Sequence, residues 1–299
     1  MRHIFTMQEL FEQGWKEAEV PQAIVSGALT RLRRGAFTQS TNANRARIDA
    51  GVKACSPKSV VSHASAALLH QLPVRRKASE TVHLTRTRTS GGRNDRDVHL
   101  YSCPVQEDEI VKIGDLKVTN LGRTVVDLAR HEPPEWALAA GDAALRAGLS
   151  EHELDLQLIR AAKRPGIRQA RRVVGLLDGL SESAGESISR WLLSQSGLPM
   201  PQLQVELTSH GELARVDFFW PELGLIGEFD GKVKYGRTLK PNQDPGEVVF
   251  AEKRREDGLR AQGYLVIRWT WADLKNPATF IAMMRAGMEL AARVVRPGS

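Results

Sequence analysis

Three carboxylates lie inside two of the most apolar short stretches of this 299-residue chain. Asp217 belongs to the run ARVDFFW, and Glu228 and Asp230 belong to the run LGLIGEFD. Burying an unpaired carboxylate is costly, so these acids require cationic partners or a bound metal ion. Mg²⁺ takes one or two protein carboxylates together with water and phosphate oxygens, a combination that favours metal-dependent hydrolysis of a phosphodiester.

A hairpin would place these acids together. The Pro-Glu-Leu-Gly sequence between the two runs is a turn signal, so the runs are predicted to be neighbouring strands. Glu228 and Asp230 are two residues apart and project from one face, with Asp217 on the adjacent strand. If the register permits, the three carboxylates converge and need a positive neighbour. Plain salt bridges are the alternative interpretation, with Lys232, Lys234 or Arg215 as the partners.

The composition is that of an ordinary globular protein, with 41% hydrophobic and 26% charged residues. The length favours two or three domains. No apolar run is long enough to span a bilayer, and the first residues lack the pattern of a secretory signal, so we expect a cytoplasmic protein without a membrane partner. Cys55 and Cys103 show no metal-binding spacing, and both are expected to be reduced.

Positive charge is concentrated in parts of the chain. The formal net charge is +7, and seven Lys or Arg residues stand against three acids between Arg75 and Asp97. A basic surface gains free energy on a phosphate backbone through counterion release, which indicates a polyanion partner. Arg75, Arg76 and Lys77 are the candidate contacts. A solvated basic loop is the alternative interpretation.

Residues 1–52 show two short helical periods, then a basic turn RRG and the strand-like run AFTQS. This order predicts a winged helix, a DNA-binding module whose second helix enters a groove and whose turn forms the wing. Arg31, Arg33 and Arg34 would end the second helix and contact phosphates. Compensation of the helix dipole explains them nearly as well.

Residues 53–180 are predicted to form an α+β middle region. A helix is expected over 57–72, where His63 and His70 repeat one face, and the runs TVHLTRT, DVHLYSC and DLKVTN are expected to be strands. Helices follow, one of them opened by a Ser150–Glu153 capping box. The Pro165–Gly166 break is a candidate hinge between the two halves of the chain.

Residues 181–299 are predicted to form an α/β layer domain. The expected order is a helix over about 183–196, three strands, a helix over about 247–262, the strand YLVIRWT and a terminal helix. Trp269 and Trp271 are two apart and would share one face of that strand, where core packing is the favoured role.

The run from ESISRWLLSQSGLPMPQLQVEL through RVDFFWPELGLIGEFDGKVKY to EKRREDGLRAQGYLVIRW resembles domains related to very-short-patch repair endonucleases. The resemblance covers roughly residues 181–285 and implies a restriction-endonuclease-like, PD-(D/E)XK nuclease fold with a mixed sheet flanked by helices. It implies Mg²⁺ or Mn²⁺ held by Asp217 and Glu228, with Glu186 as an acid on the preceding helix. Ser183 and Glu186 also read as a capping box.

The same resemblance assigns further residues. Asp230 stands where the wider fold often has a lysine, so the triplet reads E-x-D in place of E-x-K. Lys234 occupies the place of a histidine in related domains, and Lys232 or Lys234 would stabilise the developing negative charge. Lys253 is the expected basic residue of the following helix, where a charge network along the helix is the alternative.

The start of the chain, the SGALTRLRRGAFT turn and the run LKVTNLGRTVVDLAR together resemble the AbiEi family over about residues 1–150. That family implies a DNA-binding antitoxin that acts beside a cognate toxin. The leading hypothesis is therefore a Mg²⁺-dependent endonuclease delivered to double-stranded DNA by a winged helix. The alternative is a non-catalytic DNA-binding regulator or antitoxin with a degenerate nuclease fold, and an RNA-directed nuclease ranks third.

Overall fold

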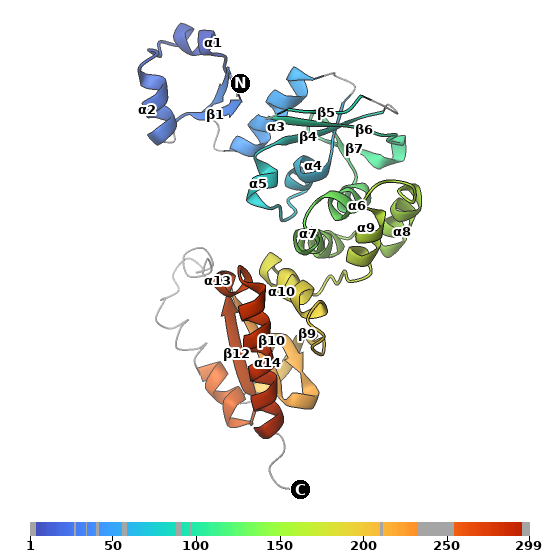
Figure 1. The fold of residues 1–299 in the computed structure, drawn as a ribbon. Helices are drawn as coiled ribbons and strands as arrows, with labels where there is room; N and C mark the ends of the chain where they lie inside the picture. Colours follow the sequence, from blue (N-terminus) through green and yellow to red (C-terminus); the bar gives the residue numbers. More distant parts are fainter. Residues whose placement is uncertain are drawn as a thin grey trace. The chain divides into compact units, whose positions relative to one another are not determined.

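The computed structural model describes residues 4–26, 28–33, 35–39, 42–55, 59–87, 91–95, 97–209, 212–231 and 254–294. The chain forms two compact units, one of residues 1–132 with 149–172 and the other of residues 133–148 with 173–299 (Figure 1). The predicted boundary at 180 differs from this division, because residues 133–148 and 173–180 belong to the second unit. Pro165 and Gly166 lie within the first unit rather than between the two.

The first unit begins with two short helices and a hairpin. Thr6 caps the first helix through a reciprocal capping box with Glu9, and a small apolar core gathers Leu10, Val20 and Phe37. The elements are α1 (Met7–Glu12), α2 (Glu19–Ser26), β1 (Thr30–Arg33) and β2 (Ala36–Thr38). The prediction of a helix through TRLR was wrong, since these residues form the first strand of the hairpin.

A six-stranded mixed sheet follows, in the order β5-β6-β4-β3-β8-β7. The predicted strands TVHLTRT, DVHLYSC and DLKVTN are confirmed as β4, β6 and β8, and β4 pairs with β6 in parallel. The short strands β3, β5 and β7 carry too few residues to show a period. The bounds are β3 (Val60–Val61), β4 (Val82–Arg86), β5 (Arg93–Asn94), β6 (Val98–Ser102), β7 (Ile110–Ile113) and β8 (Leu116–Thr119).

Helices pack on this sheet because their apolar faces meet its buried valines and leucines, among them Val82, Leu84 and Val118. The Ser150–Glu153 capping box is confirmed at the start of α8. The helix expected over 57–72 is shorter, because Val60 and Val61 pair as a strand. The helices are α3 (Ala43–Ala54), α4 (His63–Leu69), α5 (Arg76–Ser79), η1 (Glu107–Glu109), α6 (Leu121–His131), α8 (Glu151–Arg160) and α9 (Ile167–Val174), the last ending across the unit boundary.

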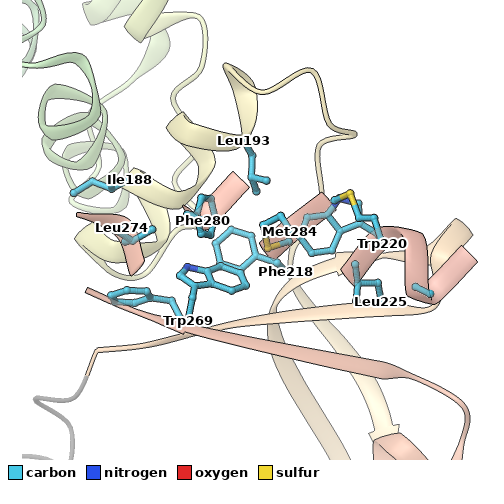
Figure 2. Close-up of a cluster of buried hydrophobic side chains, with 12 residues drawn as sticks. Ile188, Leu193, Phe218, Trp220, Leu225, Trp269, Leu274, Phe280 and Met284 are labelled. Atoms are coloured by element: carbon cyan, nitrogen blue, oxygen red, sulfur yellow. The ribbon is translucent and has the colours of Figure 1, made fainter. Parts of the chain in front are cut away.

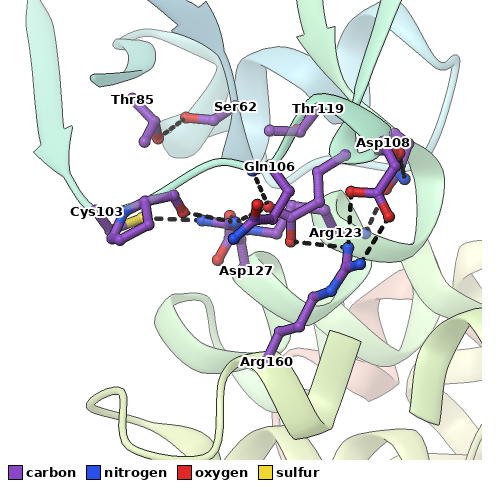
Figure 3. A network of polar contacts seen from close by, with 12 residues as sticks. Ser62, Thr85, Cys103, Gln106, Asp108, Thr119, Arg123, Asp127 and Arg160 are labelled. Atoms are coloured by element: carbon purple, nitrogen blue, oxygen red, sulfur yellow. Dashed lines mark hydrogen bonds and ion pairs between the residues drawn. The ribbon is translucent and has the colours of Figure 1, made fainter. Parts of the chain in front are cut away.

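A buried polar network joins α6 to the loops after β6 (Figure 3). The Arg123 guanidinium, 1% exposed, pairs with Glu109 at 3.0 Å and with Asp127 at 2.7 Å. It also donates to the Cys103 sulfur at 2.9 Å. Arg160 of α8 reaches Asp108 at 2.6 Å. Because every charge here has a partner, this network serves to fix the loops on the helix rather than to bind a ligand.

Aromatic rings form a stack beside this network. The Tyr101 ring lies between the rings of His63 and His99, with centroid distances of 3.7 Å and 4.0 Å. Thr85 donates to Ser62 Oγ at 2.8 Å, and Ser62 Oγ lies 2.9 Å from His63 Nδ1. Burial lowers the pKa of His63 well below its ordinary value and, with help from His99, lowers that of His83 to about 4. These imidazoles are therefore neutral at pH 7.

The second unit contains a four-stranded sheet in the order β12-β11-β10-β9. The predicted hairpin is confirmed: β10 and β11 are antiparallel, with Phe218 opposite Gly227. A short 3₁₀ turn, η2 (Pro221–Leu223), joins them and ends at Gly224 in a left-handed conformation. The strands are β9 (Gln202–Ser209), β10 (Glu212–Trp220), β11 (Leu225–Asp230) and β12 (Leu265–Thr270), the last parallel to β11.

Two helical layers sandwich this sheet. One face holds the core drawn in Figure 2, where Phe218, Trp220 and Trp269 pack against Phe280 and Met284 of the terminal helix. The other face packs against residues 254–261, which are helical and contribute Leu259. The remaining helices are α7 (Pro134–Arg146), α10 (Ala184–Ser194), α13 (Trp271–Leu274) and α14 (Pro277–Val294).

Trp269 is buried in the core as predicted, but Trp271 does not share its strand face. Thr270 caps a new helix, so Trp271 begins α13 and stacks on Trp136 of α7 at a centroid distance of 6.2 Å. The protein is thus a mixed α/β structure with mixed sheets flanked by helices, which confirms the predicted fold class at this level. Within the described residues, no helix combines the length and apolarity needed to cross a bilayer.

Candidate functional site

Two of the predicted acids face one another across the side-chain amide of Gln204. This amide donates to Glu186 Oε2 at 3.1 Å and to Asp217 Oδ1 at 3.2 Å. The second Asp217 oxygen accepts from the backbone N–H of Phe229 at 3.0 Å. Four elements therefore meet at this acid pair: α10 supplies Glu186, β9 supplies Gln204, β10 supplies Asp217, and β11 supplies the Phe229 N–H.

Glu186 is held by the start of its own helix. Ser183 is the N-cap of α10 and accepts from the Glu186 N–H, while the Ser183 hydroxyl donates to Glu186 Oε1 at 2.7 Å. The backbone N–H of Glu182 donates to Glu186 Oε2 at 2.8 Å. The capping interpretation and the functional interpretation of Glu186 are therefore compatible, since the capping bonds aim its carboxylate toward Asp217.

The electrostatics of this pair are unusual. Glu186 is 4% exposed, and burial together with the nearby negative charge of Asp217 raises the pKa of Glu186. Within the described part of the chain, neither carboxylate has a cationic side chain as a partner. The pair is consequently a partly buried, negatively charged centre that a bound cation would stabilise.

Glu228 is in a different environment. Its carboxylate, 13% exposed, pairs with Arg268 at 2.8 Å and with Arg255 at 3.0 Å. Arg255 belongs to the helical residues 254–261, on the face of the sheet opposite to α10. The alternation along β11 explains the difference, because Phe229 points toward α10, where it contacts Gly185, and Glu228 therefore points away.

The structure thus gathers Glu186 and Asp217 and separates Glu228 from them. Asp230 ends β11 with a half-buried side chain on the same face as Glu228. Lys232, Lys234 and Lys253 lie outside the described residues. In the parts of the chain that the structure describes, no three His, Cys, Asp or Glu side chains form a metal-binding group. Arg215, a predicted salt-bridge partner, pairs with Glu182 at 2.7 Å instead.

The predicted DNA-contacting residues of the first unit are only partly described. Arg31 is exposed, but it lies on β1 and not at the end of a helix as predicted, so the alternative of compensating a helix dipole does not apply. Arg33 lies on the same strand, and Arg34 is outside the described residues. Arg75 pairs with Glu132 at 3.2 Å, while Arg76 and Lys77 are exposed on α5.

Two residues of the site were missed from the sequence. Arg268 interrupts the apolar strand YLVIRWT, and this isolated cation was a usable signal for a charged partner inside the sheet. Gln204 gave no signal, because nothing in the strand run QLQVEL marks this residue as having a left-handed backbone, with φ 51°.

The fold and the acid pair define a mixed α/β protein with a partly buried pair of carboxylates in its second unit. No protein-family model matches the chain. Two uncharacterized proteins of Mycobacterium tuberculosis, MT2308 of strain CDC 1551 / Oshkosh and Rv2248 of strain ATCC 25618 / H37Rv, are each 32% identical to it over 175 residues. The match covers 58% of this chain and 58% of each relative, so the chain spans less than two thirds of their length. The crystal structure of the RV2827C protein from Mycobacterium tuberculosis is similar at 13% identity, over 69% of this chain and 83% of that chain, with a TM-score of 0.36.

Proposed function

We propose that the second unit hydrolyses phosphodiester bonds of double-stranded DNA with the help of Mg²⁺ or Mn²⁺. The observation that supports this proposal is the pairing of buried Glu186 with partly buried Asp217, whose negative charge has no cationic partner among the described residues. The order of elements, with an acid on a helix before an acidic hairpin, is the order that the resemblance to restriction-endonuclease-like folds implies.

The residues fit a divalent cation in part. Asp217 and Glu186 offer hard oxygen ligands and a net negative charge, whereas the Glu228 carboxylate is already neutralised by two arginines. Asp217 and Glu186 are therefore the residues that would hold the cation. When bound there, a divalent cation supplies a lowered pKa for a coordinated water and neutralises charge on a phosphate oxygen.

The chain itself contributes orientation and positive charge. The Phe229 N–H and the Gln204 amide fix the direction of Asp217, and the Ser183 cap fixes Glu186. Arg255 and Arg268, on the face of the sheet opposite to α10 and partly exposed at 26% and 36%, are suited to contact a backbone phosphate away from the acid pair, because a guanidinium donates to two oxygens at once. Glu228 then holds these arginines in place before the substrate arrives.

The first unit supplies the proposed DNA contact. Two short helices followed by the β1–β2 hairpin are the outline of a winged helix, which supports this finer assignment of the fold. The exposed Arg31, Arg76 and Lys77 are the described side chains that would approach the backbone phosphates.

A cleavage assay tests the proposal. The full chain is incubated with supercoiled and linear double-stranded DNA in Mg²⁺, in Mn²⁺ and in a chelator. We expect metal-dependent cleavage that falls by about 100-fold or more in Asp217→Asn, because this change removes a charged ligand. Glu222→Gln, an exposed carboxylate in the hairpin turn, is the matched control and should cleave normally. Equal cleavage by Asp217→Asn and the wild type would refute the assignment.

A second candidate is a non-catalytic DNA-binding regulator or antitoxin, with a cognate toxin as a further partner. The pairing of Glu228 with Arg255 and Arg268 favours it, since an acid neutralised by arginines needs no metal. The E-x-D triplet and the resemblance to the AbiEi family also support it. Sequence-specific binding in a gel-shift assay, without cleavage in either metal, would favour this candidate.

A further inference from the structure

We propose that Gln204 is a positioning residue that holds Glu186 and Asp217 at the spacing needed to share one divalent cation. This inference rests on the proposed function of the acid pair. It goes beyond that proposal because Gln204 belongs to a third element, β9, and is itself neither acidic nor cationic.

The hydrogen-bond chemistry fixes the orientation of the amide. Ionised carboxylates only accept hydrogen bonds, so the NH₂ end of Gln204 and not its carbonyl must face Glu186 and Asp217. The two contacts, of 3.1 Å to Glu186 and 3.2 Å to Asp217, are both made by the Gln204 Nε2 atom. One neutral group therefore links two like charges that would otherwise repel one another.

The backbone of Gln204 has an unusual conformation for a glutamine. Gln204 has φ 51°, a left-handed conformation that is uncommon and strained for a residue with a long side chain. Its neighbours keep the ladder with β10, since Leu203 pairs with Phe218 and Val205 with Val216. Glycine or asparagine would fit this backbone with less strain. A glutamine here is best explained by what its amide reaches.

The left-handed residue also accompanies a change of face along β10. Val216 belongs to the apolar cluster that contains Leu259, whereas Phe218, two residues later, belongs to the core that contains Phe280. In a regular strand these two side chains would share a face. The local irregularity at Gln204 and Asp217 lets the carboxylate turn toward Glu186 while the strand continues.

Loss of the amide should therefore weaken cation binding without unfolding the unit. Gln204→Gly removes the side chain and suits the left-handed backbone, so its thermal unfolding without metal should occur at or above the wild-type temperature. The two carboxylates lose their shared donor and separate, and we expect the Kd for Mn²⁺ to rise roughly tenfold, as for other groups that orient metal ligands. Gln204→Asn retains an amide that reaches only one carboxylate, so its Kd for Mn²⁺ should lie between those of the wild type and Gln204→Gly.

The experiment measures Mn²⁺ binding to the full chain by isothermal titration calorimetry, with Asp217→Asn as the variant that loses the site. The Mg²⁺ concentration for half-maximal DNA cleavage is a second readout. It should rise in Gln204→Gly, while kcat at saturating Mg²⁺ stays near the wild-type value. A purely structural residue would lower stability and kcat instead.

Two results would overturn the inference in different ways. If Gln204→Gly binds Mn²⁺ as tightly as the wild type while Asp217→Asn does not bind it, the acid pair is the metal site and Gln204 does not position it. If the wild type itself binds no Mn²⁺ and cleaves no DNA, the proposed function fails and this inference fails with it.

Discussion

Glu186, Asp217 and Glu228 are chemically alike but occupy different environments. Glu186 and Asp217 both accept from one neutral amide, whereas Glu228 forms ion pairs with two guanidinium groups. The difference arises because Phe229 points toward α10 and Glu228 points away along β11, and because the irregularity at Gln204 and Asp217 turns Asp217 toward α10. The chemistry available to each acid is therefore decided by the neighbours on its face of the sheet, and not by its residue type.

A residue-scale prediction concerns Glu228. Glu228→Gln removes a negative charge that pairs with Arg255 and Arg268, while Glu256 remains 3.0 Å from Arg268, so DNA affinity should increase a few-fold, with a steeper dependence on salt because more phosphate contacts form. Cleavage should fall far less than in Asp217→Asn. Filter binding across a salt series and the cleavage assay measure both effects. A loss of cleavage as large as that of Asp217→Asn would mean that Glu228 leaves its arginines and acts as a metal ligand.

At the scale of elements, the acid pair depends on the contact between α7 and α10. Arg190 of α10 pairs with Asp142 of α7 at 2.7 Å, and Asp142 is fully buried. Asp142 also accepts from the backbone N–H of Asp178 at 2.8 Å. Burial raises the pKa of Asp142, while Arg190 acts in the opposite direction. This ion pair fastens a helix from residues 133–148 to the helix that presents Glu186.

Breaking this pair should destabilise the second unit. Asp142→Ala leaves the Arg190 charge buried without its partner, which costs about 3–5 kcal/mol. The double variant Asp142→Leu with Arg190→Met removes both charges and should recover much of this loss. Urea unfolding followed by tryptophan fluorescence measures the change, since Trp191, Trp220 and Trp269 all lie in this unit. If the double variant loses as much unfolding free energy as the two single variants added together, the two side chains are not coupled.

At the scale of a whole unit, the histidine stack makes stability depend on pH. His83 has a folded-state pKa of about 4, below its ordinary value of 6.5, because burial disfavours the imidazolium. Between these two values the unfolded chain binds more protons than the folded chain. The contribution of neutral His83 to the free energy of unfolding is therefore fully present above pH 6.5. It is lost as the pH falls toward 4, and the loss is on the order of 3 kcal/mol.

Urea denaturation followed by circular dichroism at pH 7.5 and pH 5 tests this dependence. The wild-type midpoint should fall at the lower pH, and the midpoint of His83→Phe should move less, because this variant has one fewer group to protonate. His152→Gln, an exposed histidine on α8, is the control and should behave as the wild type does. An equal shift in His83→Phe and the wild type would contradict the assignment to His83.

Much of the order of elements could be read from the chain. The strands around ARVDFFW and LGLIGEFD, their hairpin, the helix over 183–196 and the Ser150–Glu153 cap all follow from periodicity and turn chemistry, which act over a few neighbouring residues. Local signals failed where long-range pairing decides the structure. TRLR has a helical composition, yet it is a strand because AFT pairs with it. Trp271 continues an apolar strand, yet Thr270 caps a helix there.

The sequence by itself determined that Asp217, Glu228 and Asp230 lie on two adjacent strands of a hairpin, because alternation and the turn are local properties. Only the tertiary structure decided which acids meet. The left-handed backbone of Gln204, the direction of α10 and the arginines of two distant segments together set Glu186 beside Asp217 and Glu228 beside Arg255 and Arg268. These contacts join residues far apart in the chain, and their free energies depend on burial, which no local pattern specifies.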